Sequence, residues 1–219
     1  MKRFNMLEKI INMINGWIYK KVNRGNTKNS FENRVSQHLL FNSLNSVISL
    51  CRKDPDAAAD LVGEISTYLQ RSLEDKAVLI PLAEELEHAI SYINIQKARF
   101  PDRLKIEQDI DVNLQCLLPA FTLQPIIDNA IRHGVLKRNN GGTVSISIKK
   151  LPDFVRFSVK DDGEGMDAGQ QALLFKSCHS RNSLYKINNV LKKVGFKGLH
   201  VESRRTVGTL IAFEIPVDN

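Results

Sequence analysis

The sequence predicts an α+β protein in which a helical hairpin precedes a domain of about 140 residues with a largely antiparallel sheet. Two observations predict this architecture. Residues 31–76 contain two segments with apolar side chains at helical spacing, separated by only a few residues. After residue 100, stretches of alternating apolar and polar residues lie between glycine-rich turns, as in strands. We therefore expect three regions, residues 1–30, 31–76 and 77–219.

The composition is that of an ordinary soluble globular protein. Hydrophobic residues make up 42% and charged residues 25% of the 219 positions. Three widely separated cysteines form no CxxC pair, which predicts neither a disulfide framework nor a zinc site and fits a reducing cytoplasm. No apolar run approaches the ~20 residues that span a bilayer, and no signal-peptide pattern is present.

Residues 1–30 carry most of the positive charge. They hold seven basic side chains and one acidic one, a net charge of +6 out of +7 for the whole chain. An apolar stripe at helical spacing runs through the same segment: Ile10, Ile11, Ile14, Trp17 and Ile18. Such a helix can lie on an anionic membrane surface, pack against a dimer mate, or simply follow another region. Direct nucleic-acid binding is not expected, because the rest of the chain has no basic excess and no matching motif.

The hairpin is expected to contain helices at residues 31–51 and 56–73. Asp54 is a suitable cap for the second helix, with Pro55 at its first position. The first helix has an apolar stripe formed by Leu40, Leu44, Val47, Ile48 and Cys51. One hairpin cannot cover apolar faces of this width, so we expect two copies to form a four-helix bundle.

His38 lies in the first of these helices. At roughly 100° per residue, its side chain points well away from the centre of the apolar stripe. The local pattern is compatible with an ordinary surface histidine and with a side chain held out for chemistry.

Residues 77–219 are expected to form the α+β domain. A linking helix falls within residues 77–100, and the helix pattern itself covers 80–100. The next expected elements are a strand at 104–110, a helix at 118–135, strands at 141–150 and 154–165, a helix at 183–195 and a hairpin at 196–216.

Three features of this domain indicate chemistry. Asn129 stands in the middle of an apolar helix, between Asp128 and His133, and an amide oxygen is a suitable ligand for Mg²⁺. The stretch "DDGEG", residues 161–165, ends a strand; its Asp can accept a hydrogen bond from an exocyclic amine such as that of adenine. Its glycines allow the backbone to approach a ligand. The third feature is the pair Gly208 and Thr209, which opens the last strand.

Together and in this order, the three features resemble the N-box, the first glycine box and the terminal Gly-Thr of the Bergerat-type ATP-binding fold. The upstream stretch "SQHLLFNSLNSV" resembles the phosphoacceptor motif of the LytS-type sensor histidine kinases. The likeness continues through "ISTYLQRSLED", "IPLAEELEHAISYINIQKARFPDRL" and "LPAFTLQPIIDNAIRHG", and covers about residues 34 to 217. The chain thus resembles a bacterial-type kinase in which a dimerisation and phosphotransfer hairpin precedes an α/β sandwich that binds ATP.

The resemblance implies a histidine autokinase of a two-component system. ATP and Mg²⁺ would be its cofactors, and His38 would accept the γ-phosphoryl group. Asn129 would hold Mg²⁺, and Asp161 would recognise adenine. The other implied nucleotide-site residues are Asp128, His133, Gly163, Gly165 and Thr209. The implied partners are a second copy of the chain and a response regulator, in this family often one with a LytTR DNA-binding domain.

The chain also departs from the family pattern. Ser36-Gln37 stands where the family has Asn-Pro, Leu39 where it has Phe, and Asp128 where it has Glu. In the ATP lid, the family reads Gly-x-Gly-Leu where this chain reads "RNSL", residues 181–184. Such glycines let backbone N–H groups approach phosphates. Arg181 and Ser183 offer side-chain contacts in their place. The alternative function is a degenerate dimeric scaffold that binds a partner with weak or no ATP turnover.

Overall fold

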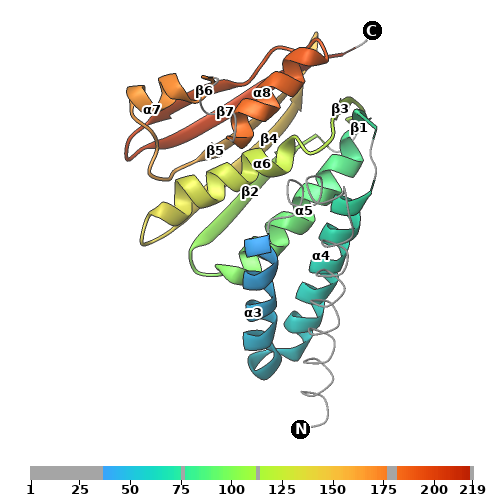
Figure 1. The fold of residues 1–219 in the computed structure, drawn as a ribbon, viewed down its shortest axis with the longest axis vertical. Helices are drawn as coiled ribbons and strands as arrows, with labels where there is room; N and C mark the ends of the chain where they lie inside the picture. Colours follow the sequence, from blue (N-terminus) through green and yellow to red (C-terminus); the bar gives the residue numbers. More distant parts are fainter. Residues whose placement is uncertain (1–36, 75–76, 112–113, 177–181, 218–219) are drawn as a thin grey trace, which may run out of the picture. The chain divides into compact units, whose positions relative to one another are not determined.

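The computed structural model describes residues 37–74, 77–111, 114–176 and 182–217 (Figure 1). The chain divides into two compact units, residues 1–74 and 75–219, and each is described by itself. The basic helix expected at residues 1–30 lies outside the described residues.

The described part of the first unit is a helical hairpin, as the sequence predicts. Helix α3 (Gln37–Lys53) and helix α4 (Pro55–Leu73) are joined at Asp54. The Asp54 carboxylate accepts a hydrogen bond of 3.0 Å from the Ala57 N–H, and Pro55 begins the helix. Both predictions about this turn are confirmed. The buried side chains of the two helices include Leu40, Leu44, Val47, Leu61 and Ile65.

The expected apolar stripe of α3 is wrong at one position. Ile48 is 42% exposed, whereas Leu39, which the stripe omitted, is 4% exposed. The buried face is therefore centred on Leu39, Leu40, Ser43, Leu44 and Val47. An α-helix has 3.6 residues per turn, so Ile48 lies at the edge of a buried face that is centred on these residues.

The second unit contains a five-stranded sheet in the order β2-β4-β5-β7-β6. The bounds of its strands are β2 (Leu104–Ile110), β4 (Gly142–Lys150), β5 (Phe154–Asp161), β6 (His200–Arg204) and β7 (Gly208–Pro216). Strands β2 and β4 pair in parallel, and the other pairs are antiparallel. Alternation along β4 and β5 gives the sheet one apolar face, on which the rings of Phe157 and Phe213 stack at 4.6 Å.

Helices cover this apolar face. Helix α6 (Leu123–Asn129) and helix α8 (Ser183–Lys193) lie across the sheet, and α5 (Leu82–Arg99) packs beside α6 (Figure 1). Leu123, Ile126 and Ile127 of α6 and Leu184 and Leu191 of α8 are buried. The predicted combination of a hairpin with an α/β sandwich is confirmed.

Two predicted helices begin later than expected. The helix expected at 80–100 begins at Leu82, and the one expected at 118–135 begins at Leu123. The preceding residues form two short strands instead, β1 (Leu79–Pro81) and β3 (Leu117–Pro119), which pair with each other. A proline ends each strand, and neither proline can donate a backbone hydrogen bond. Local periodicity could not predict this long-range pairing.

The N-box helix also changes its winding. After Asn129 it continues as a π-helical turn, η1 (Ala130–Gly134), and then as a 3₁₀ turn, η2 (Val135–Lys137). Such π-helical turns are rare in proteins, and those that occur often lie at functional sites. A short helix that the sequence did not predict, α7 (Ala168–Leu173), follows the glycine loop. In the parts of the chain that the structure describes, no helix has the length and apolarity needed to cross a membrane.

Candidate functional site

Asp161, the last residue of β5, has a buried carboxylate. The residue is 2% exposed, and its Oδ1 accepts a hydrogen bond of 2.9 Å from the Gly163 N–H. Burial raises the pKa of this carboxyl from 3.8 to about 6, although backbone hydrogen bonds from Gly163 and Thr209 oppose the rise. A buried carboxylate at a strand end is a suitable acceptor for a ligand amine.

Glycines surround this carboxylate at very short range. A Cβ atom on Gly134 would lie 2.4 Å from Oδ1 and 2.5 Å from Cγ of Asp161. A Cβ on Gly163 would lie 2.1 Å from the carbonyl carbon of Gly134. The Glu164 N–H donates to the Gly134 carbonyl oxygen at 3.3 Å. The end of the N-box segment therefore touches the glycine loop directly, and no side chain larger than hydrogen fits between them.

Two further glycines connect the loop to the last hairpin. Gly165 has a φ of 67°, and a Cβ there would lie 2.1 Å from the Arg204 carbonyl oxygen. Gly208 has a φ of 122°, and a Cβ there would lie 1.9 Å from the Asp161 carbonyl oxygen. Thr209 follows directly, is 6% exposed and is the cross-strand partner of Asp161. Four of the predicted site residues, Asp161, Gly163, Gly165 and Thr209, are thus brought together.

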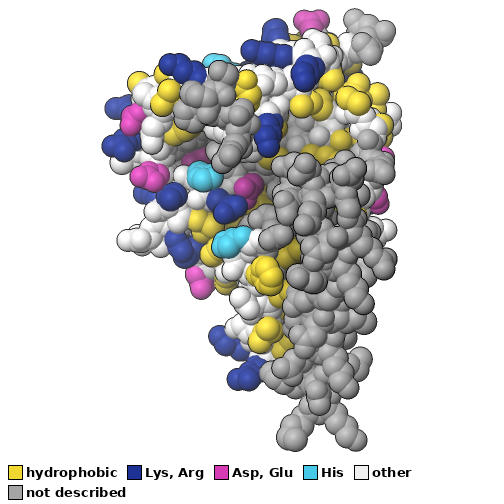
Figure 2. Space-filling view, in the orientation of Figure 1, with side chains coloured by type: hydrophobic (Ala, Val, Ile, Leu, Met, Phe, Trp, Pro, Cys, Tyr) yellow, Lys and Arg dark blue, Asp and Glu magenta, His cyan; other side chains and the backbone are white. Residues whose placement is uncertain are grey.

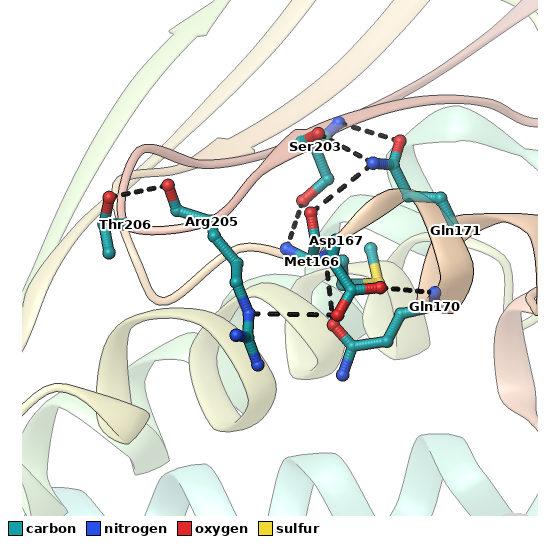
Figure 3. A network of polar contacts seen from close by, with 7 residues as sticks. All are labelled: Met166, Asp167, Gln170, Gln171, Ser203, Arg205 and Thr206. Atoms are coloured by element: carbon teal, nitrogen blue, oxygen red, sulfur yellow. Dashed lines mark hydrogen bonds and ion pairs between the residues drawn. The ribbon is translucent and has the colours of Figure 1, made fainter.

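Ser203 is at the centre of the polar network that holds this loop (Figure 3). Its Oγ accepts a hydrogen bond from the Met166 N–H at 2.8 Å and lies 2.8 Å from Oγ1 of Thr209. The Gln171 side chain, from α7, donates to the Ser203 carbonyl oxygen at 2.8 Å and accepts from the Ser203 N–H at 3.2 Å. The network joins the glycine loop, α7 and the last hairpin. Sequence reasoning missed Ser203 and Gln171, since neither belongs to a contiguous motif with Asp161.

Asp128 and Asn129 end helix α6 and are both half-buried. The Tyr92 hydroxyl donates a short hydrogen bond to Oδ1 of Asp128, and Nη1 of Arg132 lies 3.8 Å from its Oδ2. His133 is exposed in the π-helical turn. Gly134, rather than His133, is the residue of this turn that abuts Asp161. Sequence reasoning missed Gly134, although a glycine that closes the N-box helix was a usable signal.

The surface over helix α6 carries both positively and negatively charged side chains. Figure 2 shows Lys and Arg side chains interspersed with carboxylates on the face that carries α6. Among the described residues, no group of three or more His, Cys, Asp or Glu side chains could hold a metal ion.

His38 belongs to the first unit and has an exposed side chain near the start of α3. The amide Nδ2 of Asn42, one turn later, lies 3.0 Å from both ring nitrogens of His38. The Asn42 amide is therefore placed to orient the His38 ring by a hydrogen bond within one helical turn. Sequence reasoning missed Asn42, although it lies within the stretch that resembles the phosphoacceptor motif.

The fold and the site first indicate a broad class of ATPase domains, and the comparisons with known proteins then assign the family. The α/β sandwich that contains the buried Asp161 and carries Asn129 belongs to the class of ATPase domains shared by histidine kinases, DNA gyrase B and Hsp90. A family model described as "Histidine kinase-, DNA gyrase B-, and HSP90-like ATPase" matches residues 120–219, and one described as "Histidine kinase" matches residues 27–104. The chain belongs to the histidine kinase family, among the LytS-type sensor kinases.

Similar proteins support this assignment. The chain is 34% identical to the sensor protein LytS of Bacillus cereus, over 84% of this chain and 33% of LytS. It is 31% identical to YwpD, an uncharacterized protein of Bacillus subtilis, over 84% of this chain and 68% of YwpD. The nucleotide-free catalytic domain of the histidine kinase ThkA has the same fold, with a TM-score of 0.50 and 18% identity over 65% of this chain and 97% of that domain. The chain spans about a third of the length of its LytS relatives.

Proposed function

We propose that this chain is the catalytic part of a two-component histidine autokinase. It would transfer the γ-phosphoryl group of ATP to His38 and then to an aspartate of a response regulator. The proposal rests on one combination of features. The buried carboxylate of Asp161 is closely packed among glycines, and the same chain has an exposed histidine, His38. The first of these features suits adenine, and the second suits a phosphoryl group.

In the proposal, Asp161 recognises the adenine base. Its ionised carboxylate accepts a hydrogen bond from the exocyclic amine. Gly134 and Gly163 allow the backbone to pack closely around the carboxylate, because a Cβ on Gly134 would collide with it. Thr209, fixed by Ser203, adds a hydroxyl beside the same carboxylate.

The proposed metal ligand is Asn129, and its half-buried amide suits Mg²⁺. Mg²⁺ takes few protein oxygens, keeps several waters and shares the phosphate oxygens, so one amide fits without an acidic cluster. The ion would supply neutralisation of phosphate charge. Arg132 is an exposed cation three residues after Asn129, and its guanidinium can pair with phosphate oxygens in place of Asp128. We assign His133, also exposed, to the rim of this site.

His38 acts as the nucleophile in this proposal. Its unprotonated nitrogen attacks the γ-phosphorus, the new N–P bond forms, and the bond to the bridging oxygen of the departing ADP breaks. Asn42, one turn later on α3, orients the ring for this attack. The aspartate carboxylate of the response regulator then takes the phosphoryl group and frees the imidazole.

We prefer this function to the degenerate scaffold for a physical reason. A buried carboxyl whose pKa is raised to about 6 lowers the stability of the folded domain at neutral pH. This loss of stability has no benefit in a scaffold, whereas in a nucleotide site the buried carboxylate binds the ligand. In the lid, Asn182 caps α8 by accepting from the Leu184 N–H at 2.9 Å, so this helix can begin without the glycines of the family pattern.

The experiment that tests the proposal is a calorimetric titration of the chain with ADP and with a non-hydrolysable ATP analogue. Each is measured with and without Mg²⁺. Binding of both nucleotides, strengthened by Mg²⁺, is expected for the kinase. A chain that binds no adenine nucleotide would leave the scaffold as the better description.

Nucleotide affinity is expected to fall on acidification. Because the carboxyl of Asp161 has a pKa of about 6, protons compete with the adenine amine below that pH. The Kd for ADP should rise by up to about tenfold per pH unit between pH 6 and pH 4. Calorimetry across this range checks the prediction, with Asp161→Asn as the control whose residual affinity should not follow pH in this way.

The unliganded domain should show the opposite trend in stability. The folded-state pKa of Asp161 is raised from 3.8 to about 6, so the folded protein holds a proton that the unfolded chain releases in this window. This contribution to stability is present below about pH 4 and is lost as pH rises through about 6. Asn at this position resembles the protonated carboxyl at every pH, so Asp161→Asn should be more stable than wild type at pH 7 by thermal unfolding.

We further propose a homodimer in which two hairpins form a four-helix bundle. Phe41 is 60% exposed and Ile48 is 42% exposed, so these apolar side chains are available to a second copy. Ile48→Asp is expected to weaken the dimer at least about tenfold, as measured by light scattering. Leu44→Asp is the control that should unfold the hairpin itself, since Leu44 is 7% exposed within one chain. A wild-type chain that stays monomeric at micromolar concentration would exclude the dimer.

Two finer assignments complete the proposal. The response regulator would carry a LytTR DNA-binding domain, so the chain itself would not contact nucleic acid. The net charge of +6 in residues 1–30 supports contact with an anionic membrane surface from the cytoplasmic side.

A further inference from the structure

Helix α5 packs a polar face, rather than only apolar side chains, against its neighbours. The polar stripe of α5 comprises Glu85, His88, Tyr92, Gln96 and Arg99, which follow one another at intervals of three or four residues. Glu85, His88, Tyr92 and Gln96 are each 1% exposed, and Arg99 is half-buried. Burial of polar groups destabilises a fold unless they are hydrogen-bonded, so this stripe calls for an explanation.

Three members of the stripe form a hydrogen-bonded chain that ends in the N-box. Arg99 Nη1 donates to Gln96 Oε1 at 2.9 Å, and Gln96 Nε2 donates to the Tyr92 hydroxyl at 2.7 Å. The Tyr92 hydroxyl in turn donates to Oδ1 of Asp128. Each bond runs in the same direction, from a cation towards a carboxylate, and such chains strengthen their members.

A fourth member holds the other end of α6. Glu85 accepts hydrogen bonds from the Phe121 N–H at 2.9 Å and from the Leu123 N–H at 2.8 Å. Thr122, at the N-cap of α6, makes no side-chain capping bond of its own. Glu85 therefore replaces the local cap, and its negative charge suits the positive end of the helix dipole.

We infer that the polar stripe of α5 positions α6, with Tyr92 and Glu85 as positioning residues for Asn129. Tyr92 acts at the C-terminal end of α6 and Glu85 at its N-terminal end, so α6 cannot shift along α5 without breaking hydrogen bonds. Asp128 then serves as the acceptor for Tyr92, and not as a base or a metal ligand. This inference rests on the proposed function, in which Asn129 holds Mg²⁺.

Three substitutions separate this role from a role for the charge of Asp128. Tyr92→Phe removes the donor, Asp128→Ala removes the acceptor, and Asp128→Asn keeps an acceptor oxygen without the charge. The measured quantity is the ratio of the Kd for ADP without Mg²⁺ to that with Mg²⁺. Tyr92→Phe and Asp128→Ala should each lower this ratio about fivefold to tenfold. Asp128→Asn should stay within about twofold of wild type, and the Mg²⁺-free Kd should change little in all three.

A matched control and one outcome decide the matter. Lys97→Gln alters an exposed side chain of the same helix and should leave the ratio unchanged. If Asp128→Asn lowers the ratio as much as Asp128→Ala while Tyr92→Phe is neutral, Asp128 acts through its charge and the inference is wrong.

A second measurement needs no nucleotide. In the unliganded chain, amide hydrogen exchange along α6 should be faster in Tyr92→Phe and in Asp128→Ala than in wild type, and unchanged in Asp128→Asn. Unchanged exchange in all three variants would refute the positioning role. Faster exchange in a chain that binds no nucleotide would keep the positioning role and overturn only the proposed function.

Discussion

His38→Gln is expected to abolish autophosphorylation while it leaves nucleotide binding intact. His38 has an exposed ring that contacts Asn42, and glutamine offers Asn42 a similar hydrogen-bonding partner without a nucleophilic ring nitrogen. Incubation with γ-labelled ATP and Mg²⁺ should give acid-labile label on the wild-type chain, and label at the level of the blank on the variant.

The control for this experiment is His200→Gln. His200 is also an exposed histidine, and its Nε2 lies 2.8 Å from Glu202 in strand β6. This variant should take up label as the wild type does. Acid-labile label that persists in His38→Gln at the wild-type level would move the phosphoacceptor to another residue.

The second large effect is expected from a single methyl group at Gly134. In Gly134→Ala, the new Cβ would meet the Asp161 carboxylate at 2.4 Å, a distance that no relaxed structure tolerates. The carboxylate or the π-helical turn must therefore move. Affinity for ADP should fall about 100-fold, equivalent to about 3 kcal/mol, as measured by calorimetry.

Gly63→Ala is the matched control for that substitution. Gly63 lies within α4, and a Cβ there would meet nothing within 4 Å. The change should stabilise the hairpin by about 1 kcal/mol and leave ADP affinity unaltered, because alanine favours a helix over glycine. Wild-type affinity in Gly134→Ala would mean that Asp161 is not the residue that contacts the base.

Contiguous motifs were the part of the site that the sequence could predict. Asp161, Gly163 and Gly165 lie within five residues, and one strand-end turn accounts for their placement. Gly134 and Ser203 could not be predicted in the same way. Their contacts with this loop depend on how the N-box segment and the last hairpin close over it, which is a property of the tertiary structure.

The fold was predicted with the same strengths and the same gaps. Long periodic segments were assigned correctly, and the beginnings of α5 and α6 were not, because the pairing of β1 with β3 joins residues almost forty positions apart. In α5, Leu82, Ala89 and Ile93 are buried at helical spacing, and Leu86 on the same face is half-buried. The polar stripe on the same helix went unnoticed, because buried polar residues follow helical spacing just as apolar residues do.

The contact between Gln171 and Ser203 has a consequence for solubility. Strand β6 lies at the edge of the sheet, where unpaired backbone groups can recruit a strand from another molecule. The Gln171 amide occupies both the N–H and the carbonyl oxygen of Ser203, much as a neighbouring strand would. Helix α7 thus shields this edge near the C-terminal end of β6. Any change that detaches α7 would leave that edge free for intermolecular pairing, so the chain would become prone to aggregation.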